Sequence, residues 1–189
     1  MKTIPFLVAS LFCVSSVVAA AVAPLPSNSV LQLSDSYITQ DGKDFTLASR
    51  RGHPQVVAMF YTSCQMVCPL ILDTARGVDK SLTPAEQARL RVLFISMDPA
   101  NDTPAALLAV AKKRKLDPAR WTLARTDEKG VRKVAALLGV RYRRLANGEF
   151  NHTSALFLLD ADGRILAKTE KIGATPDPEF MTKVHAALK

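Results

Sequence analysis

Short, continuously apolar runs alternate along this chain with segments of helical periodicity, and this alternation constrains the fold more than any other feature. The clearest apolar runs, 56–61, 92–95 and 155–159, have the length expected of strands buried on both faces. Apolar residues at helical spacing predict helices between and after these runs, over 69–82, from 104 onward, around 131–138 and over 180–188. With a further strand predicted over 121–125, the pattern indicates an α/β fold in which helices flank a central mixed sheet.

Two turn signals predict β-hairpins at the ends of this pattern. Residues 40–43, Gln-Asp-Gly-Lys, separate two β-prone stretches within 36–47 and predict an N-terminal β-hairpin extension. Residues 160–163, Asp-Ala-Asp-Gly, turn the last apolar strand into a strand over 165–168. The sheet is therefore expected to end in a hairpin followed by the C-terminal helix.

The first residues have the pattern of a secretory signal peptide. Lys2 precedes the apolar run 4–18, and Ala19 and Ala21 satisfy the small-residue rule for cleavage after Ala21. An uncleaved membrane anchor is the alternative, because the apolar segment is nearly long enough to cross a bilayer. We therefore expect an exported protein of the bacterial periplasm, divided into a signal peptide over 1–21, a linker and first strand over 22–35, and one folded domain over 36–189.

Composition and charge exclude several classes of protein. Hydrophobic residues make up 48% of the 189-residue chain and charged residues 22%, as in ordinary globular domains and unlike disordered or collagen-like chains. The formal net charge is +8, with basic clusters at 112–115 and at Arg141, Arg143 and Arg144. An exported protein meets little nucleic acid, so these clusters indicate solvated surfaces or, alternatively, attraction to anionic lipid or to an acidic partner.

Two cysteines follow the first central strand directly. Cys13 lies in the signal segment, which leaves Cys64 and Cys68 in the mature chain. A helical turn would place their Cα atoms about 6 Å apart, a separation that suits either a disulfide or two thiolates converging on a soft metal. The start of a helix should also lower the pKa of both thiols. Cysteines at such a strand-to-helix junction indicate a thioredoxin-like fold, and the spacing alone leaves disulfide and metal site open.

Three groups of residues in the same order resemble the SCO/SenC family. They are the stretch 60–69 with both cysteines, the stretch 94–104 containing Ser-Met-Asp-Pro, and His152 followed by Phe-Leu-Leu-Asp at 157–160. The resemblance implies a thioredoxin-like fold and a copper site formed by Cys64, Cys68 and His152. It also implies that the protein helps to build the binuclear copper centre of cytochrome c oxidase. Gln65 and Phe60 depart from residues common in the family, which leaves open which oxidase is the client.

The donor set itself favours copper as Cu(I) or Cu(II). Thiolates prefer Cu(I) and imidazole accepts both oxidation states, whereas a structural zinc site requires four ligands. The remaining candidate side chains are expected to have other roles: His53 in a loop, His185 on a helix surface, Met59 and Met66 in packing, and Asp98 beside the site or facing a partner. Asp102 or Thr103 can cap the helix that starts at 104, and capping is the simplest role for Asp102.

The sequence leaves two functions open. The preferred one is a copper chaperone that is not an enzyme and that serves the copper-site subunit of cytochrome oxidase, with another copper chaperone or a thioredoxin-like reductant as further partners. The alternative is a thiol-disulfide oxidoreductase that uses Cys64 and Cys68 to reduce the client's copper-site cysteines. Against it, redox-active thioredoxins use a C-x-x-C pair facing a cis-proline, and this chain has no proline between Pro118 and Pro176. A copper-resistance or redox-sensing binder is a third, less favoured possibility.

Overall fold

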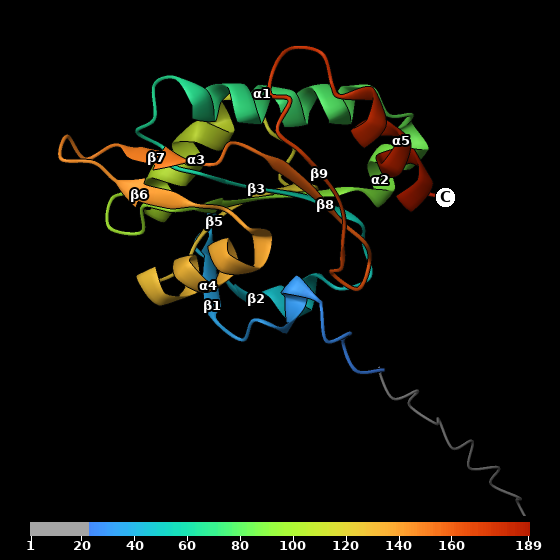
Figure 1. Cartoon of the computed structure of the whole chain (residues 1–189), viewed down its shortest axis with the longest axis horizontal. Helices are drawn as coiled ribbons and strands as arrows, with labels where there is room; N and C mark the ends of the chain where they lie inside the picture. Colours follow the sequence, from blue (N-terminus) through green and yellow to red (C-terminus); the bar gives the residue numbers. More distant parts are fainter. Residues whose placement is uncertain (1–22) are drawn as a thin grey trace, which may run out of the picture.

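The computed structural model describes residues 23–189, which form one α/β domain around a seven-stranded mixed sheet (Figure 1). The strand order is β2-β1-β5-β4-β3-β8-β9. These strands are β1 Ser36–Thr39, β2 Asp44–Thr46, β3 Gln55–Phe60, β4 Arg91–Ser96, β5 Trp121–Arg125, β8 Leu156–Leu159 and β9 Ile165–Thr169. A separate two-stranded hairpin contains β6 Tyr142–Arg144 and β7 Phe150–His152.

Helices cover both faces of the large sheet, as the sequence predicts. Figure 1 shows α1 and α3 on one face and α4 on the other. The helices are α1 Val67–Lys80, α2 Pro84–Arg89, α3 Pro104–Lys113, α4 Glu128–Leu138 and α5 Pro178–Ala187, with short 3-10 turns η1 Val30–Gln32 and η2 Leu47–Arg50. In the part of the chain that the structure describes, no helix is long and apolar enough to span a membrane.

Strand β3 lies in the middle of the sheet, and its pairing with β4 places the loops that follow these two strands next to each other. All six of its residues are buried, because β4 and β8 pair with its two edges and helices cover its faces. Strands β3 and β4 are parallel, with Phe60 opposite Ser96, and the Met97 N–H donates to the Phe60 carbonyl at 2.8 Å. The loops that follow the two strands therefore start side by side at one edge of the sheet.

Both predicted hairpins are present, since β1 pairs with β2 and β8 with β9 in antiparallel register. A linker and first strand were expected over 22–35, and the described part of this segment, 23–35, differs from that expectation. It contains η1, and the first strand begins at Ser36. Val30 and Leu31 are buried in the core, and the Val30 N–H donates to the Gly163 carbonyl at 2.9 Å. The packed domain thus includes residues before 36, while the signal-peptide prediction for 1–21 lies outside the described residues.

The boundary of α1 also differs from the sequence prediction. The helix begins at Val67 rather than Pro69, so Cys68 lies in its first turn and Cys64 in the loop before it. The expectation that one helical turn holds both cysteines is therefore wrong. The distance between Cys64 and Cys68 therefore depends on the conformation of this loop, which is set by the contacts between the loop and the sheet.

Candidate functional site

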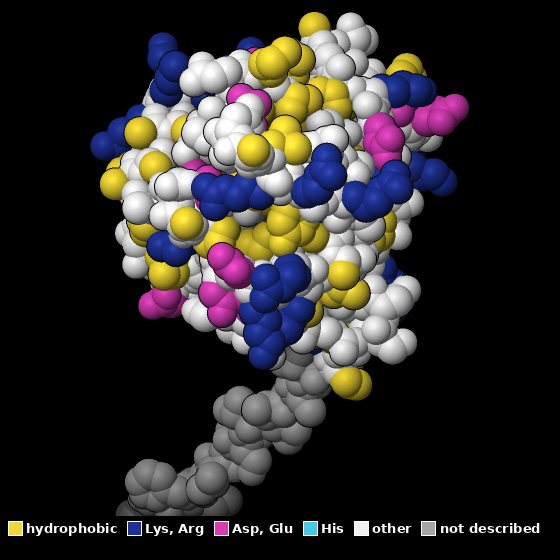
Figure 2. All heavy atoms as spheres, turned by 60° about the vertical axis from the view of Figure 1, so that its left-hand side comes forward, with side chains coloured by type: hydrophobic (Ala, Val, Ile, Leu, Met, Phe, Trp, Pro, Cys, Tyr) yellow, Lys and Arg dark blue, Asp and Glu magenta, His cyan; other side chains and the backbone are white. Residues whose placement is uncertain are grey.

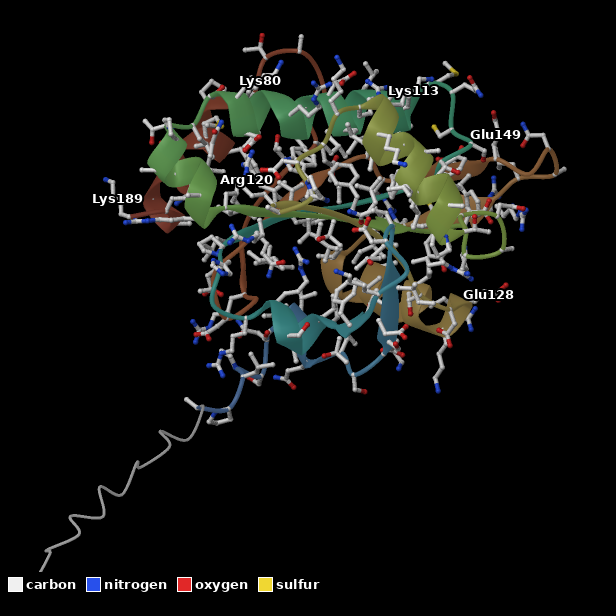
Figure 3. All side chains as sticks on the ribbon, turned by 180° about the vertical axis from the view of Figure 1, so that it is seen from behind. Lys80, Lys113, Arg120, Glu128, Glu149 and Lys189 are labelled. Carbon is white, nitrogen blue, oxygen red and sulfur yellow. The ribbon has the colours of Figure 1, made fainter. Side chains whose placement is uncertain are left out.

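The cysteine loop joins the end of β3 to α1 and holds the two thiols together. The Cys68 N–H donates to Cys64 Sγ at 3.3 Å. Cys64 and Cys68 are buried, with 9% and 4% of each residue exposed, and both are free thiols. A cavity of about 370 Å³ opens beside them between α1 and the end of α3, where Figure 3 marks Lys113. The thiols are thus buried but lie next to a cavity that connects them to the surface.

Asp102 anchors the cysteine loop to the neighbouring strand. Its fully buried carboxylate accepts hydrogen bonds from the Thr62 N–H at 3.1 Å, the Thr62 hydroxyl at 2.5 Å and the Ser96 hydroxyl at 2.5 Å. Burial raises the pKa of Asp102, although these hydrogen bonds oppose the change. Of the two predicted caps, Thr103 rather than Asp102 caps α3, because the Thr103 side chain accepts a hydrogen bond from the Ala106 N–H. Asp102 instead fixes the loop two residues before Cys64.

His152 reaches the cysteines from the last residue of β7. Its Nε2 lies 3.7 Å from Cys68 Sγ, and its Nδ1 lies 3.0 Å from the Thr153 carbonyl oxygen. Burial lowers the pKa of His152, while the bond to the carbonyl opposes this change. We assign the neutral tautomer in which Nδ1–H donates to the carbonyl and the Nε2 lone pair faces Cys68. Metal-binding histidines are commonly oriented by a hydrogen bond of this kind.

The two thiols differ in acidity, which the sequence did not predict. Burial would raise the pKa of Cys64, but hydrogen bonds from the N–H groups of Cys68 and Met66 and from the side chains of Cys68 and Tyr61 lower it. Burial raises the pKa of Cys68 well above its ordinary value, and the neighbouring Cys64 raises it further. The expectation that the start of the helix would lower both pKa values therefore holds only for Cys64, which ionises first.

Tyr61 connects the cysteine loop to the hairpin that carries the histidine. Its ring lies 6.0 Å from the His152 ring and 5.1 Å from the Phe150 ring, measured between centroids, and both contacts are edge-on. Its hydroxyl accepts a hydrogen bond from the Phe150 N–H at 3.3 Å. Sequence reasoning missed this role of Tyr61, although its position directly between β3 and the cysteines was the available signal.

The two methionines near the cysteines have opposite environments. Met59 is 2% exposed in β3, as expected of a core methionine. Met66 is 81% exposed, so its predicted role in packing is wrong. It precedes α1 at the surface, and Leu70 in the first part of that helix is also exposed. An exposed apolar rim thus lies beside the thiols.

The other candidate residues lie away from the thiols. His53 is exposed in the loop before β3, as predicted. His185 is on α5 and pairs with Glu86 Oε1 at 2.6 Å, which agrees with its predicted surface position. Asp98 is buried after β4, where one carboxylate oxygen accepts from the Asn101 amide at 2.8 Å. Asp98 lines a different cavity from the one beside the cysteines.

The predicted ligands are assembled only in part. Cys68 Sγ contacts His152 Nε2, and Cys64 Sγ accepts a hydrogen bond from the Cys68 N–H and is hydrogen-bonded to the Cys68 side chain, but Cys64 has no contact with His152 among the hydrogen bonds of the described residues. Within residues 23–189, no three Cys, His, Asp or Glu side chains already form a group that could hold a metal ion. The donor types and the orientation of His152 nevertheless suit a soft metal, and Cys64 belongs to a loop rather than to a rigid helix.

Comparison with known proteins is decisive for the family. The SCO1/SenC family model matches residues 29–189, which include every described element of the fold. The chain belongs to the SCO1/SenC family. A SCO1 protein homolog of Bacillus subtilis is 26% identical over 155 residues, which cover 80% of each chain.

Solved structures of the family share the fold. The copper-bound structure of ScoI from Bradyrhizobium japonicum has a TM-score of 0.67 and 25% identity, covering 81% of this chain and 96% of that chain. BsSco, described as having a disulfide switch and as a member of the Sco family of cytochrome c oxidase assembly proteins, has a TM-score of 0.70 and 24% identity over 81% of this chain and 90% of its own. The predicted thioredoxin-like fold is confirmed, and copper-bound members exist within the family.

Proposed function

We propose that this protein binds copper through Cys64, Cys68 and His152 and assists assembly of the copper centre of cytochrome c oxidase. The observation that carries the proposal is the contact between Cys68 Sγ and His152 Nε2, made while the other ring nitrogen is held by a carbonyl. The copper-bound structure of ScoI and the description of the Sco family as cytochrome c oxidase assembly proteins support it.

The residues fit copper through their chemistry and through their acid-base states. Two thiolates and one imidazole suit Cu(I), and the imidazole also accepts Cu(II). His152 presents an unprotonated nitrogen, and the lowered pKa of Cys64 favours its thiolate. Burial raises the pKa of Cys68, so Cys68 must release its proton to bind the metal, and metal uptake therefore releases protons.

Titration with a competing Cu(I) chelator tests this proposal on the purified, reduced protein. We expect one Cu(I) per chain and loss of reactivity at both thiols. Replacing either cysteine by Ser should abolish tight binding, whereas His53→Ala, which changes an exposed loop histidine, should leave binding unchanged. A stoichiometry near zero with both thiols still reactive would contradict the proposal.

His152→Ala separates the oxidation states. Loss of the nitrogen ligand should severely weaken Cu(II) binding, measured by thiolate-to-Cu(II) charge-transfer absorption, while Cu(I), held by two thiolates, should be affected less. An unchanged Cu(II) spectrum in a variant that folds like the parent would remove the histidine from the site.

A second candidate, thiol-disulfide exchange with the client, is favoured by the unequal acidity of the two thiols. Cys64, the more acidic, would attack a client disulfide, and Cys68 would then displace the client thiol from the mixed disulfide. The client disulfide gains two electrons and becomes two thiols, while Cys64 and Cys68 lose two electrons and form a disulfide.

The same His152→Ala variant tests this second candidate, because exchange depends on thiolate attack and access rather than on the imidazole. Reduction of a model disulfide should therefore persist in the variant, with the Cys64–Cys68 disulfide visible as a mass loss of about 2 Da. Persistent free thiols under mild oxidation would show that the fold keeps the sulfurs apart and would exclude this role.

We also propose that the protein is exported to the bacterial periplasm, with cleavage after Ala21, and acts on the copper-site subunit of the oxidase there. The apolar run 4–18 and the alanines that follow it support export. The intact mass of protein isolated from the periplasm tests it, and a mass that retains the first 21 residues would favour an uncleaved anchor.

A further inference from the structure

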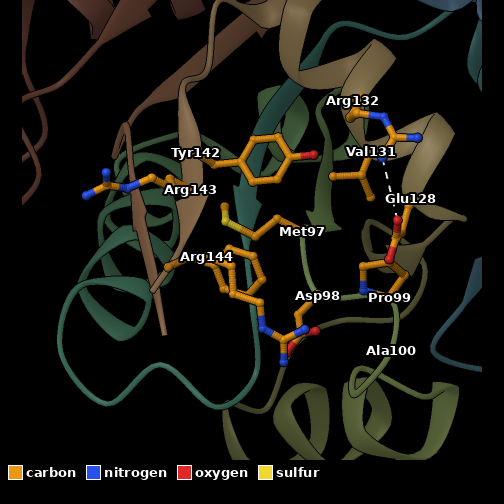
Figure 4. Close-up of a pocket in the computed structure, with 11 residues that line it drawn as sticks. Met97, Asp98, Pro99, Ala100, Glu128, Val131, Arg132, Tyr142, Arg143 and Arg144 are labelled. Atoms are coloured by element: carbon orange, nitrogen blue, oxygen red, sulfur yellow. Dashed lines mark ion pairs between the residues drawn. The ribbon is translucent and has the colours of Figure 1, made fainter. Parts of the chain in front are cut away.

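A second cavity lies between the β6–β7 hairpin, the first turns of α4 and the loop after β4 (Figure 4). Its volume is about 430 Å³, and neither cysteine lines it. The apolar part of its wall comes from Met97, Pro99, Val131, Tyr142 and Phe150. A cavity of this size can accept one or two side chains against the apolar part of its wall.

Arginines border the cavity, and two of them have no acidic partner. Arg132 pairs with Glu128 at 3.5 Å, which Figure 4 marks with a dashed line. Among residues 23–189, by contrast, Arg143 and Arg144 form no ion pair and no side-chain hydrogen bond. Arg144 lies over the Phe150 ring with its guanidinium carbon 5.7 Å from the centroid. Both arginines are exposed, so their charges face whatever approaches the cavity.

Among the described residues, neither acidic side chain of the cavity forms an ion pair with Arg143 or Arg144. Glu128 is already paired, and Asp98 is buried, with one carboxylate oxygen bound to Asn101 and the other without a hydrogen-bond partner in the described structure. Figure 2, which brings this side of the molecule forward, shows Lys and Arg side chains bordering apolar ones. The surface combines a hollow with a partly apolar wall and unpaired positive charge at its edge.

We propose that this cavity docks an acidic segment of a partner protein that inserts an apolar side chain between Tyr142, Val131 and Phe150. Carboxylates of the segment would pair with Arg143 and Arg144, as expected from charge complementarity. A second copy of this chain is a poor occupant because each copy carries a formal charge of +8. A flat membrane surface is also a poor occupant, because it cannot fill a concave hollow.

Docking here would place the partner close to the thiol site, an inference that rests on the proposed function. Tyr142 pairs directly with His152 across the hairpin, and Phe150 both lines the cavity and packs on Tyr61. The arginine-edged cavity and the candidate ligand His152 therefore belong to one small structural unit. Its partner would be a client with an acidic surface around its own metal-accepting or thiol groups.

Binding of a labelled peptide to copper-free protein tests the docking site separately from the metal site. The probe is Asp-Glu-Phe-Glu-Asp with a fluorescein label, followed by anisotropy, and its partner probe carries Ser in place of Phe. We expect the Phe peptide to bind and the Ser peptide to bind about tenfold more weakly, because only the first fills the hollow. Equal binding of both peptides would overturn the proposal, since bulk charge would then explain the affinity.

Two pairs of matched variants locate the binding. The double variant Arg143→Glu/Arg144→Glu should weaken binding of the Phe peptide about tenfold. The control is the double variant Lys80→Glu/Lys183→Glu, which makes an equal charge change at exposed lysines elsewhere and should change binding less than about twofold. Ala100→Trp, which fills the cavity from its exposed edge, should also weaken binding, while Ala119→Trp, at an exposed position outside the cavity, should not.

The outcomes distinguish the possible occupants. Equal effects of the arginine and lysine pairs would overturn the proposal, as would undetectable binding of the Phe peptide. Arginine-dependent binding to vesicles of phosphatidylcholine and phosphatidylglycerol, without arginine-dependent peptide binding, would replace the partner protein by a membrane. Because copper is absent from every measurement, failure here leaves the copper site untouched, and failure of the chelator titration leaves the docking site untouched.

Discussion

Replacing Asp102 by Ala should destabilise the protein more than any other single change in the loops around the cysteines. The substitution removes the acceptor for the Thr62 N–H, the Thr62 hydroxyl and the Ser96 hydroxyl, all in the buried region between β3 and β4. A hydrogen bond to a charged group contributes about 1.5–3 kcal/mol, and a buried donor left without an acceptor costs about 1–3 kcal/mol.

The net effect is smaller than the sum of these values. The two hydroxyls can rotate about their C–O bonds, whereas the Thr62 N–H has a fixed direction. Burial already disfavours the charged form of Asp102, as its raised pKa shows, so part of the stabilisation is offset in the native protein. We therefore expect a loss of about 3 kcal/mol in the free energy of unfolding, within the range for a broken buried network.

Urea denaturation of the reduced, copper-free protein measures this loss. With a slope of about 2 kcal/mol per M, the midpoint should fall by about 1.5 M. Asp41→Ala is the matched control, because Asp41 is exposed in the β1–β2 turn, and its free energy of unfolding should change by less than about 0.5 kcal/mol. A shift for Asp102→Ala as small as that of the control would refute the assignment of Asp102 as the anchor of the loop.

Two further substitutions test the remaining parts of the structure. Gly163→Ala should destabilise the fold by more than about 2 kcal/mol, because Gly163 has φ +82° and an added Cβ would collide with Leu31. Gly42→Ala is the control: Gly42 has φ +74° but open space around it, so the cost should be only about 1 kcal/mol. Equal losses of stability for the two variants in thermal unfolding would contradict the packing of η1 on the turn that contains Gly163. Phe150→Ala should weaken Cu(II) binding more than Cu(I) binding, because it removes the ring that packs on Tyr61 and holds the hairpin carrying His152 against the domain. An unchanged ratio of the Cu(II) and Cu(I) affinities would show that other contacts fix the hairpin.

The sheet and its order of elements were predictable from local patterns. Strands β3, β4 and β8 are buried on both faces and therefore appear as continuous apolar runs, and the β1–β2 and β8–β9 turns contain glycine at positive φ. Helix α2 was not predicted, although its capping box, Thr83 with Glu86, is a recognisable start signal. Local signals of this kind depend on neighbouring residues only, which is why they can be identified without the structure.

The β6–β7 hairpin could not be predicted in the same way. Each strand has three residues, mostly polar or half-buried, so neither shows the apolar alternation of a strand with one covered face. Their position depends instead on Tyr61, which is 89 residues from Phe150 in the sequence and packs against its ring. Contacts over such separations leave no periodic pattern in either segment.

The same distinction explains the cysteine site. The residue types suggested a metal or redox pair, but the helical geometry assumed from the four-residue spacing was wrong, because Cys64 precedes α1. What positions Cys64 is Asp102, which follows β4, and what positions His152 is the hairpin. Parallel pairing of β3 with β4 brings Asp102 to the cysteine loop, and the Tyr61–Phe150 contact brings the hairpin with His152 to that loop. Both contacts join segments far apart in the sequence, which is why the residue types of the site were predictable and their arrangement was not.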